Sequence, residues 1–261
     1  HDSHRRQRQM CIRDSACIII QFINIIFSKS IYEVKFLRKI IMHITVENLL
    51  KIKEKVKAKF DLNKNLMKLP EIIAVSKTFK INHILPVIEQ GHIHYGENKV
   101  QEAAEKWTSL KKENKNIKLH LIGRLQTNKV KLALSLFDYI HSLDSKKLAD
   151  KIFNIQQQLN LKTKLFIQVN IGNEDQKSGI SKNDVHDFYN YCKNLNLDVI
   201  GLMCIPPFNE DTKKYFEEMK DLNEKFKLNE LSMGMSSDYL EAIENNATFV
   251  RIGSNIFGQR S

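Results

Sequence analysis

Short apolar segments alternate with longer amphipathic segments from residue 42 to the end of the chain. This alternation predicts strands separated by helices. Two parallel strands need a long crossover between them, usually a helix, so the pattern indicates a parallel sheet. The predicted strands cover residues 72–77, 92–98, 118–123, 139–144, 164–170, 198–205, 230–235 and 248–254. One more helix is predicted ahead of the first strand, at residues 45–60.

Eight strand–helix units in about 210 residues fit a closed (β/α)8 TIM barrel of the α/β class. The alternative is an open, doubly wound sheet, which usually carries a GxGxxG turn after its first strand. The sequence contains no such turn. We therefore predict one barrel domain over residues 42–261, with an N-terminal helix. In such a barrel the chemistry gathers at the carboxyl ends of the strands.

Residues 1–41 differ in character from the rest of the chain. They are basic and polar at first and become apolar over residues 16–27. A basic stretch before an apolar one is typical of a signal peptide, but a membrane span needs about 20 apolar residues. The segment QRQMCIRDS resembles a translated sequencing adapter. We expect residues 1–41 to be a non-native or disordered extension, and we expect no membrane segment.

The formal net charge of +11 raises the question of a nucleic-acid partner. The surplus lysines are spread over several predicted helices, and we find neither interleaved aromatic residues nor a known nucleic-acid motif. We therefore expect no nucleic-acid partner. Cys192 and Cys204 lack the spacing of a metal site, and a chain of this size does not depend on disulfides. We expect both to be reduced, buried thiols in a cytoplasmic protein.

The first predicted strand ends at Lys77, in the run IIAVSK. Lysines are normally solvated, and a surface lysine at a strand end is the ordinary interpretation. A lysine in the mouth of a barrel is different, because burial lowers the pKa of its amine and makes it a nucleophile near neutral pH.

Small and hydroxyl residues follow the last two predicted strands. Ser236 lies in the segment MSSD, and Gly253 and Ser254 follow the eighth strand. Serines at a helix start are usually caps, yet the same N–H groups can bind a phosphate. Barrels commonly place a phosphate site in these two loops. A lysine able to form a Schiff base, together with a phosphate site, indicates pyridoxal 5′-phosphate (PLP).

Arg251 lies two residues before Gly253, so the two positions share one face of the strand. An arginine that points into a barrel needs an acceptor. The pyridine nitrogen of PLP is one, and a salt bridge to Glu97 or Asp144 is the alternative. An arginine at that nitrogen keeps it unprotonated and makes the ring a poor electron sink. His120 is either a general base or a hydrogen-bonded inward residue.

The chain resembles the pyridoxal phosphate homeostasis proteins, once called proline synthetase co-transcribed proteins, over about residues 45–260. The segments that carry the resemblance occur in the same order: AVSKTF, GENKVQEAAEKW, HLIGRLQTNK, KSGI, GLMCIPP, LSMGMSSDYLEAI and VRIGSNIFG. The resemblance implies a barrel like the N-terminal domain of alanine racemase, with PLP held as an internal aldimine. It implies these roles: the aldimine on Lys77, phosphate contacts at Ser236, Gly253 and Ser254, Arg251 near the ring nitrogen, and Asn98 close to the ring.

The resemblance also implies a monomeric or weakly associated protein that holds PLP and passes it transiently to apoenzymes, without established turnover. The main alternative is a PLP-dependent amino-acid racemase. Racemases of this lineage take a second base from a separate β-domain and a partner subunit, and neither Tyr95 nor Tyr139 is an evident replacement. A barrel that uses Lys77 for aldol chemistry without PLP is the third hypothesis. Because the sequence stops soon after the eighth strand, we expect either a last seam of the barrel that is partly uncovered or a chain that is slightly truncated.

Overall fold

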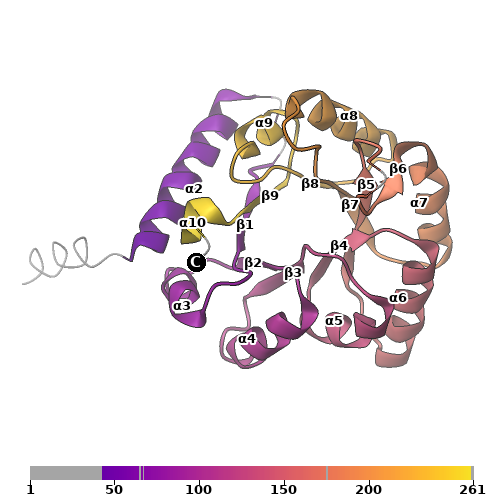
Figure 1. Ribbon diagram of the computed structural model, residues 1–261, viewed down its shortest axis with the longest axis horizontal. Coiled ribbons are helices and arrows are strands. Elements are labelled where there is room, and N and C mark those ends of the chain that lie inside the picture. The colour runs from indigo at the N-terminus through magenta and orange to yellow at the C-terminus, as the bar shows by residue number, and fades with distance from the viewer. Residues whose placement is uncertain (1–42, 65, 67, 175, 260–261) are drawn as a thin grey trace, which may run out of the picture. The chain divides into compact units, whose positions relative to one another are not determined.

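The computed structural model describes residues 43–64, 66, 68–174 and 176–259, so the predicted extension at residues 1–41 lies outside the described residues. The described chain forms a closed ring of eight parallel strands, as predicted (Figure 1). The ring consists of β1 (Glu71–Val75), β2 (His94–Glu97), β3 (Lys118–Leu121), β4 (Tyr139–Leu143), β5 (Lys164–Asn170), β7 (Val199–Cys204), β8 (Glu230–Ser232) and β9 (Phe249–Ile252). Pairing of β1 with β9 and of β4 with β5 closes it.

Helices follow the strands and surround the ring. They are α2 (Ile44–Leu62), α3 (Ile81–Glu89), α4 (Val100–Glu113), α5 (Val130–Leu136), α6 (Lys146–Leu159), α7 (Val185–Asn194), α8 (Thr212–Lys225), α9 (Tyr239–Glu244) and α10 (Ser254–Phe257). Local signals set several of these limits, because the Ser145 hydroxyl caps α6 and the left-handed Asn160 ends it. The short strand β6 (Ile180–Ser181) pairs with β5 and was not predicted. Within the described part of the chain, no helix has the length and apolar character needed to cross a membrane.

The last seam of the barrel is covered, so the expectation of a partly open seam was wrong. Helix α10 is only one turn long, but helix α2 packs against α10, α3 and α9 (Figure 1). The side-chain amide of Asn48 in α2 donates to the carbonyl of Ile256 in α10 at 3.1 Å. The apolar face of α2, which includes Leu49 and Val56, is buried there. The helix that precedes the first strand therefore takes the place of a long final helix.

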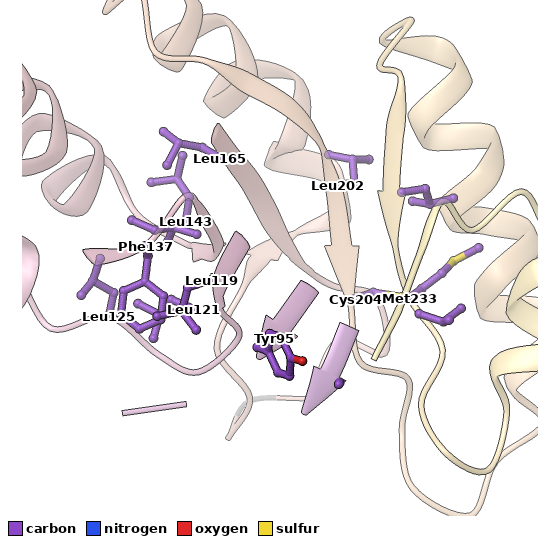
Figure 2. Packing of buried hydrophobic residues seen from close by; sticks show 14 of the residues in the cluster. Tyr95, Leu119, Leu121, Leu125, Phe137, Leu143, Leu165, Leu202, Cys204 and Met233 are labelled. Carbon is purple, nitrogen blue, oxygen red and sulfur yellow. The ribbon is translucent and has the colours of Figure 1, made fainter. Parts of the chain in front are cut away.

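The main hydrophobic core lies between the strands and the surrounding helices. Leu119 and Leu121 of β3 are fully buried, and in Figure 2 they lie together with Leu125 and Phe137. Trp107 of α4, also fully buried, belongs to the same cluster. A buried side chain of this size contributes roughly 1.5–3 kcal/mol or more relative to exposure. This layer fixes the strands and therefore the loops that follow them.

The interior of the barrel holds a second, more polar layer. His94, His120 and His141 project into it from neighbouring strands, and all three are buried. The ring of His120 stacks on Tyr139 and the ring of His141 stacks on Phe166, each with centroids 4.2 Å apart. Burial lowers the pKa of His120 and of His141 well below the usual 6.5, so both imidazoles are neutral.

We expect the free energy of unfolding to fall as the pH is lowered below 6.5. The unfolded chain then binds protons that the buried imidazoles of His120 and His141 do not bind in the folded state. For these two side chains together, the free energy of unfolding falls by about 3 kcal/mol between pH 6.5 and 5. Urea unfolding at a series of pH values measures the slope. His141→Gln should flatten it by about 1.4 kcal/mol per pH unit. His186→Gln, at an exposed position, is the control, and an unchanged slope in His141→Gln would contradict the expectation.

Candidate functional site

A cavity of about 490 Å³ lies at the carboxyl ends of the barrel strands, within the usual range for small-molecule sites. Its lining includes all six residues singled out from the sequence, namely Lys77, Asn98, Ser236, Arg251, Gly253 and Ser254. The other lining residues are Val75, Phe79, Ile122, Gly123, Ile205, Met235, Ser237 and Gly258. Amine, guanidinium and hydroxyl groups therefore share one space with apolar walls.

Lys77 lies in a tight turn just after β1 and is half-buried. The N–H of Phe79 donates to the carbonyl of Ser76 and closes this turn. Thr78 adopts φ = 69°, a left-handed conformation that is strained for a β-branched residue. The N–H of Thr78 donates to the carboxylate of Glu102 in α4 at 2.8 Å, which helps to hold it there. The turn thus fixes the backbone that carries the Lys77 amine.

A buried ionic cluster lies behind this turn, and its members were not singled out as site residues from the sequence. Glu97 of β2 points away from the barrel interior and is fully buried. One of its carboxylate oxygens accepts from the Ser76 hydroxyl at 2.8 Å, from Lys106 at 2.9 Å and from the Trp107 indole at 2.9 Å. Lys106 also donates to the carbonyl of Ser76 at 3.0 Å. The cluster therefore ties the end of β1, one residue before Lys77, to β2 and α4.

Asn98 and Gly123 form a second side of the cavity. The side-chain oxygen of Asn98 is buried and has no hydrogen-bond partner among the described residues. A buried polar atom of this kind is costly unless something satisfies it. A Cβ at Gly123 would lie 2.3 Å from the carbonyl oxygen of Asn98, so only glycine allows this approach of the two strand ends. Asn98 thus lines the cavity and carries a buried acceptor that no described residue satisfies.

Arg251 of β9 lies between the cavity and the barrel interior and is only 4% exposed. Its guanidinium donates to the Ser232 hydroxyl and to the carbonyl of Cys204, each at 2.8 Å. It forms no salt bridge with Glu97 or Asp144 among the described residues, so the ion-pair alternative weighed from the sequence is wrong. Burial lowers the pKa of the guanidinium from its usual value, yet an arginine stays charged in proteins.

In the strand order, β9 and β8 follow β1 on one side, and β2, which precedes Asn98, lies on its other side. The loops after β8 and β9 therefore line the cavity on the side away from Asn98. The side-chain amide of Asn255 donates to the carbonyl of Ser236 at 2.8 Å and joins the two loops. Ser254 is the first residue of α10, and the first N–H groups of any helix lack partners within it. Gly253 lets the backbone pass close to Val75 of β1. These loops offer N–H and hydroxyl donors to an anion.

Three residues considered from the sequence lie away from the cavity. His120 is buried in the barrel interior and hydrogen-bonded, which matches the inward interpretation rather than that of a general base. Tyr139 stacks on it, and the hydroxyl of Tyr95 donates to the carbonyl of His92 outside the barrel.

Cys192 and Cys204 are buried free thiols as expected, and burial raises the pKa of each to about 12.

Comparison with known proteins finds relatives across most of the chain. The family model of the alanine racemase N-terminal domain matches residues 53–261. The pyridoxal phosphate homeostasis protein of Aquifex aeolicus is 40% identical over 200 residues, which is 73% of this chain and 87% of that protein. The protein of the same name from Pasteurella multocida is 36% identical over 225 residues, 82% of this chain and 97% of that protein.

Solved structures give the same picture. PipY of Synechococcus elongatus, with PLP bound, superposes with a TM-score of 0.69 at 32% identity, covering 79% of this chain and all of that one. An alanine racemase of Clostridium difficile reaches a TM-score of 0.57 at 15% identity, covering 79% of this chain but 57% of that one. The second likeness shows a common barrel fold and nothing more.

We expect Lys106→Met to destabilise the fold by about 3–5 kcal/mol, because it leaves the buried Glu97 carboxylate without its cation. Lys112→Met, at an exposed position of the same helix, is the matched control and should cost less than about 0.5 kcal/mol. Urea unfolding of both variants measures the difference. A loss below about 1 kcal/mol in Lys106→Met would mean that the pair does not hold β1, β2 and α4 together.

Proposed function

Because the chain belongs to the pyridoxal phosphate homeostasis protein family, within the group that shares the alanine racemase N-terminal domain, we propose that it holds PLP in the cavity at the strand ends and supplies it to apoenzymes. The observation that carries the proposal is the meeting of Lys77, Arg251 and two donor-rich loops around one cavity. The PLP bound to PipY, a relative at 32% identity, supports it.

The residues around the cavity fit the chemistry of PLP, which has an aldehyde, a pyridine nitrogen, a phosphate and a flat apolar ring. Lys77 offers an amine and Arg251 a cationic donor. Ile122 and Ile205 offer apolar surface for the ring. The buried, unsatisfied oxygen of Asn98 is the structural sign that a polar partner belongs in this space.

We assign the covalent attachment to Lys77. Its amine would add to the aldehyde carbon, and loss of one water would leave a carbon–nitrogen double bond, as in other lysine Schiff bases. When bound, PLP supplies an electron sink for amino-acid chemistry. The strained turn at Thr78 and the Glu97 cluster hold the backbone on either side of Lys77. The backbone position from which the Lys77 side chain extends is therefore fixed.

We assign the phosphate to the two loops that follow β8 and β9. Ser236 and Ser254 carry hydroxyls, and the N–H groups of Ser254 and Asn255 precede the first hydrogen bonds of α10, in which Ile256 and Phe257 donate to Gly253. Gly253 has no side chain to block an approach to the backbone. Barrels of this class commonly bind phosphate in these loops.

We assign Arg251 to the pyridine nitrogen and Asn98 to the neighbourhood of the ring. The bonds of Arg251 to Ser232 and Cys204 occupy two of its five N–H donors, and others remain for an acceptor in the cavity. An arginine does not give up a proton readily, so the nitrogen would stay unprotonated and the ring would stabilise a carbanion poorly. A site of this kind suits storage and transfer better than turnover.

We also propose that the protein acts as a monomer in the cytoplasm and meets apoenzymes only transiently. The rim of the cavity is accessible, since Ser254 and Met235 are exposed. PLP held there can therefore be reached from solvent, which a protein that passes it on requires.

We expect borohydride treatment of the PLP-loaded chain to fix PLP on Lys77, because reduction makes the imine bond permanent. Peptide mass spectrometry locates the adduct, and Lys77→Ala should lose it together with the aldimine absorbance band. Lys80→Ala, an exposed lysine three residues along, is the control and should keep both. An adduct on another lysine in the Lys77→Ala variant would refute the assignment.

The alternative of a PLP-dependent racemase makes a different prediction. No tyrosine lines the cavity among the described residues, and Arg251 would leave the ring a weak electron sink. We therefore expect the loaded protein to exchange the α-proton of alanine with deuterium far more slowly than typical enzymes turn over, which is about 1 to 1000 per second. Proton NMR in deuterium oxide measures the exchange. A rate within that range would favour the racemase.

A further inference from the structure

An unbroken line of hydrogen bonds runs from Arg251 through the interior of the barrel. Arg251 donates to the Ser232 hydroxyl at 2.8 Å, and that hydroxyl lies 3.0 Å from Nδ1 of His141. Nε2 of His141 lies 2.9 Å from Nδ1 of His120, and Nε2 of His120 lies 2.8 Å from Nδ1 of His94. Every distance is that of a normal hydrogen bond. The proposed function uses only the first member of this line.

The line joins the two ends of the barrel. Arg251 lines the cavity at the carboxyl ends of the strands, whereas His94 is the first residue of β2 and lies near the amino ends. Nε2 of His94 lies 3.8 Å from the carboxylate of Glu71, the exposed first residue of β1. The step from Ser232 in β8 to His141 in β4 joins strands on well-separated parts of the ring.

The donor inventory gives the line one direction. Arginine can only donate, so the Ser232 oxygen accepts from Arg251. The single hydroxyl proton of buried Ser232 then has one described acceptor left, Nδ1 of His141. A neutral imidazole that accepts at Nδ1 carries its proton on Nε2. His141 therefore donates to His120, His120 donates to His94, and His94 presents an N–H toward Glu71.

We propose that Ser232, His141, His120 and His94 form a one-directional relay that positions Arg251 at the cavity and balances its buried charge against Glu71 at the other end of the barrel. We refer to these four residues as the relay. They are positioning residues, since they act on the cavity only through Arg251. The effect on PLP rests on the proposed function, but the relay itself is a property of the chain alone.

The relay compensates part of the free-energy cost of burying the Arg251 cation. A buried guanidinium is expensive unless hydrogen bonds and an opposite charge compensate it. Arg251 makes no salt bridge among the described residues, and Asp238 acts on it only as a more distant charge. In the relay each side chain turns its lone pair toward Arg251 and its proton toward Glu71. Hydrogen bonds aligned in this way polarise one another, so the cation and the distant carboxylate both gain.

The charges around the relay favour neutral imidazoles. Burial lowers the pKa of His94 to about 4 and is the largest cause, with Lys118 and Lys68 acting in the same direction and Asp138 and Glu230 opposing them. His120 faces Lys111 and His92 besides its two relay neighbours, and His141 faces Arg251. Among the described residues, Glu71 is the one carboxylate in ion-pair contact with a histidine of the relay. A single fixed set of tautomers near neutral pH is the consequence.

The first experiment reads the tautomers directly in the cofactor-free, full-length chain labelled with ¹⁵N at its nine histidines. Two-dimensional ¹H–¹⁵N spectra at pH 7 distinguish Nδ1–H, Nε2–H and doubly protonated rings. Single His→Gln variants assign the signals. The expected result is the neutral Nε2–H form for His94, His120 and His141. The Nδ1–H form or a doubly protonated ring at any of the three would overturn the proposal.

The second experiment removes the residue that sets the direction. Ser232→Ala deprives His141 of its donor and should shift the ring ¹⁵N signals of all three relay histidines, whereas Ser232→Thr keeps a hydroxyl and should restore them. Ser142→Ala is the matched control, because Ser142 is equally buried on β4 but its hydroxyl has no partner among the described residues. Unchanged signals in Ser232→Ala, or the same shifts in Ser142→Ala, would overturn the proposal.

The third measurement connects the relay to the cavity. Loss of one charge-assisted bond to Arg251 should weaken PLP retention roughly tenfold in Ser232→Ala, with retention kept in Ser232→Thr and Ser142→Ala. Equal retention in all three would overturn the positioning role. If the chain held no PLP on Lys77 but showed the expected tautomers, the proposed function would fail and the relay would stand. PLP on Lys77 with other tautomers would mean the reverse.

Discussion

The burial of one guanidinium constrains much of this structure. Arg251 must remain a cation at the boundary between the cavity and the buried barrel interior, and its acceptors lie on strands other than its own. The Cys204 carbonyl at the end of β7 and the Ser232 hydroxyl on β8 supply them. The interior of the barrel is accordingly polar along one line, with three histidines where aliphatic side chains usually dominate. Tyr139 and Phe166 stack against two of those histidines, and Ile73, Val75, Met203 and Phe249 pack in the same interior cluster.

A second buried charge organises the outside of the barrel wall. The Glu97 carboxylate at the end of β2 accepts hydrogen bonds from Ser76, which follows β1, and from Lys106 and Trp107 of α4. One carboxylate therefore links two neighbouring strand ends and a helix. The cavity therefore lies between two ionic groups, one inside the ring and one outside it. Both belong to rigid strands, whereas the donors of the last two loops come from short turns. The Arg251 guanidinium comes from β9 itself, and the Lys77 amine comes from the turn that directly follows β1.

The sequence was sufficient for the fold and for six of the residues around the cavity, five of them from local pattern and Asn98 through the family resemblance. Alternating strands and helices predicted the barrel, and strand ends predicted where Lys77, Arg251 and Gly253 would meet. The relay depended on register instead. Gly96 pairs with His120, and His120 pairs with Tyr139, which places His141 one step further along the barrel axis. No spacing within one segment encodes such offsets. The covering of the last seam by α2 was missed for the same reason, since it joins residues more than two hundred positions apart.

Closure of the ring by β1 and β9 has a consequence for synthesis of the protein. At about 5–20 residues per second, the ribosome needs on the order of ten seconds or more after making β1 to deliver its partner β9. Until then β1 has an unpaired edge toward β9, and unpaired edges recruit other strands. Helix α2 is the first of the described elements to be made, yet it packs against α10, which is the last of them. The nascent chain therefore passes through a stage in which β1 is paired along one edge and α2 exposes its apolar face.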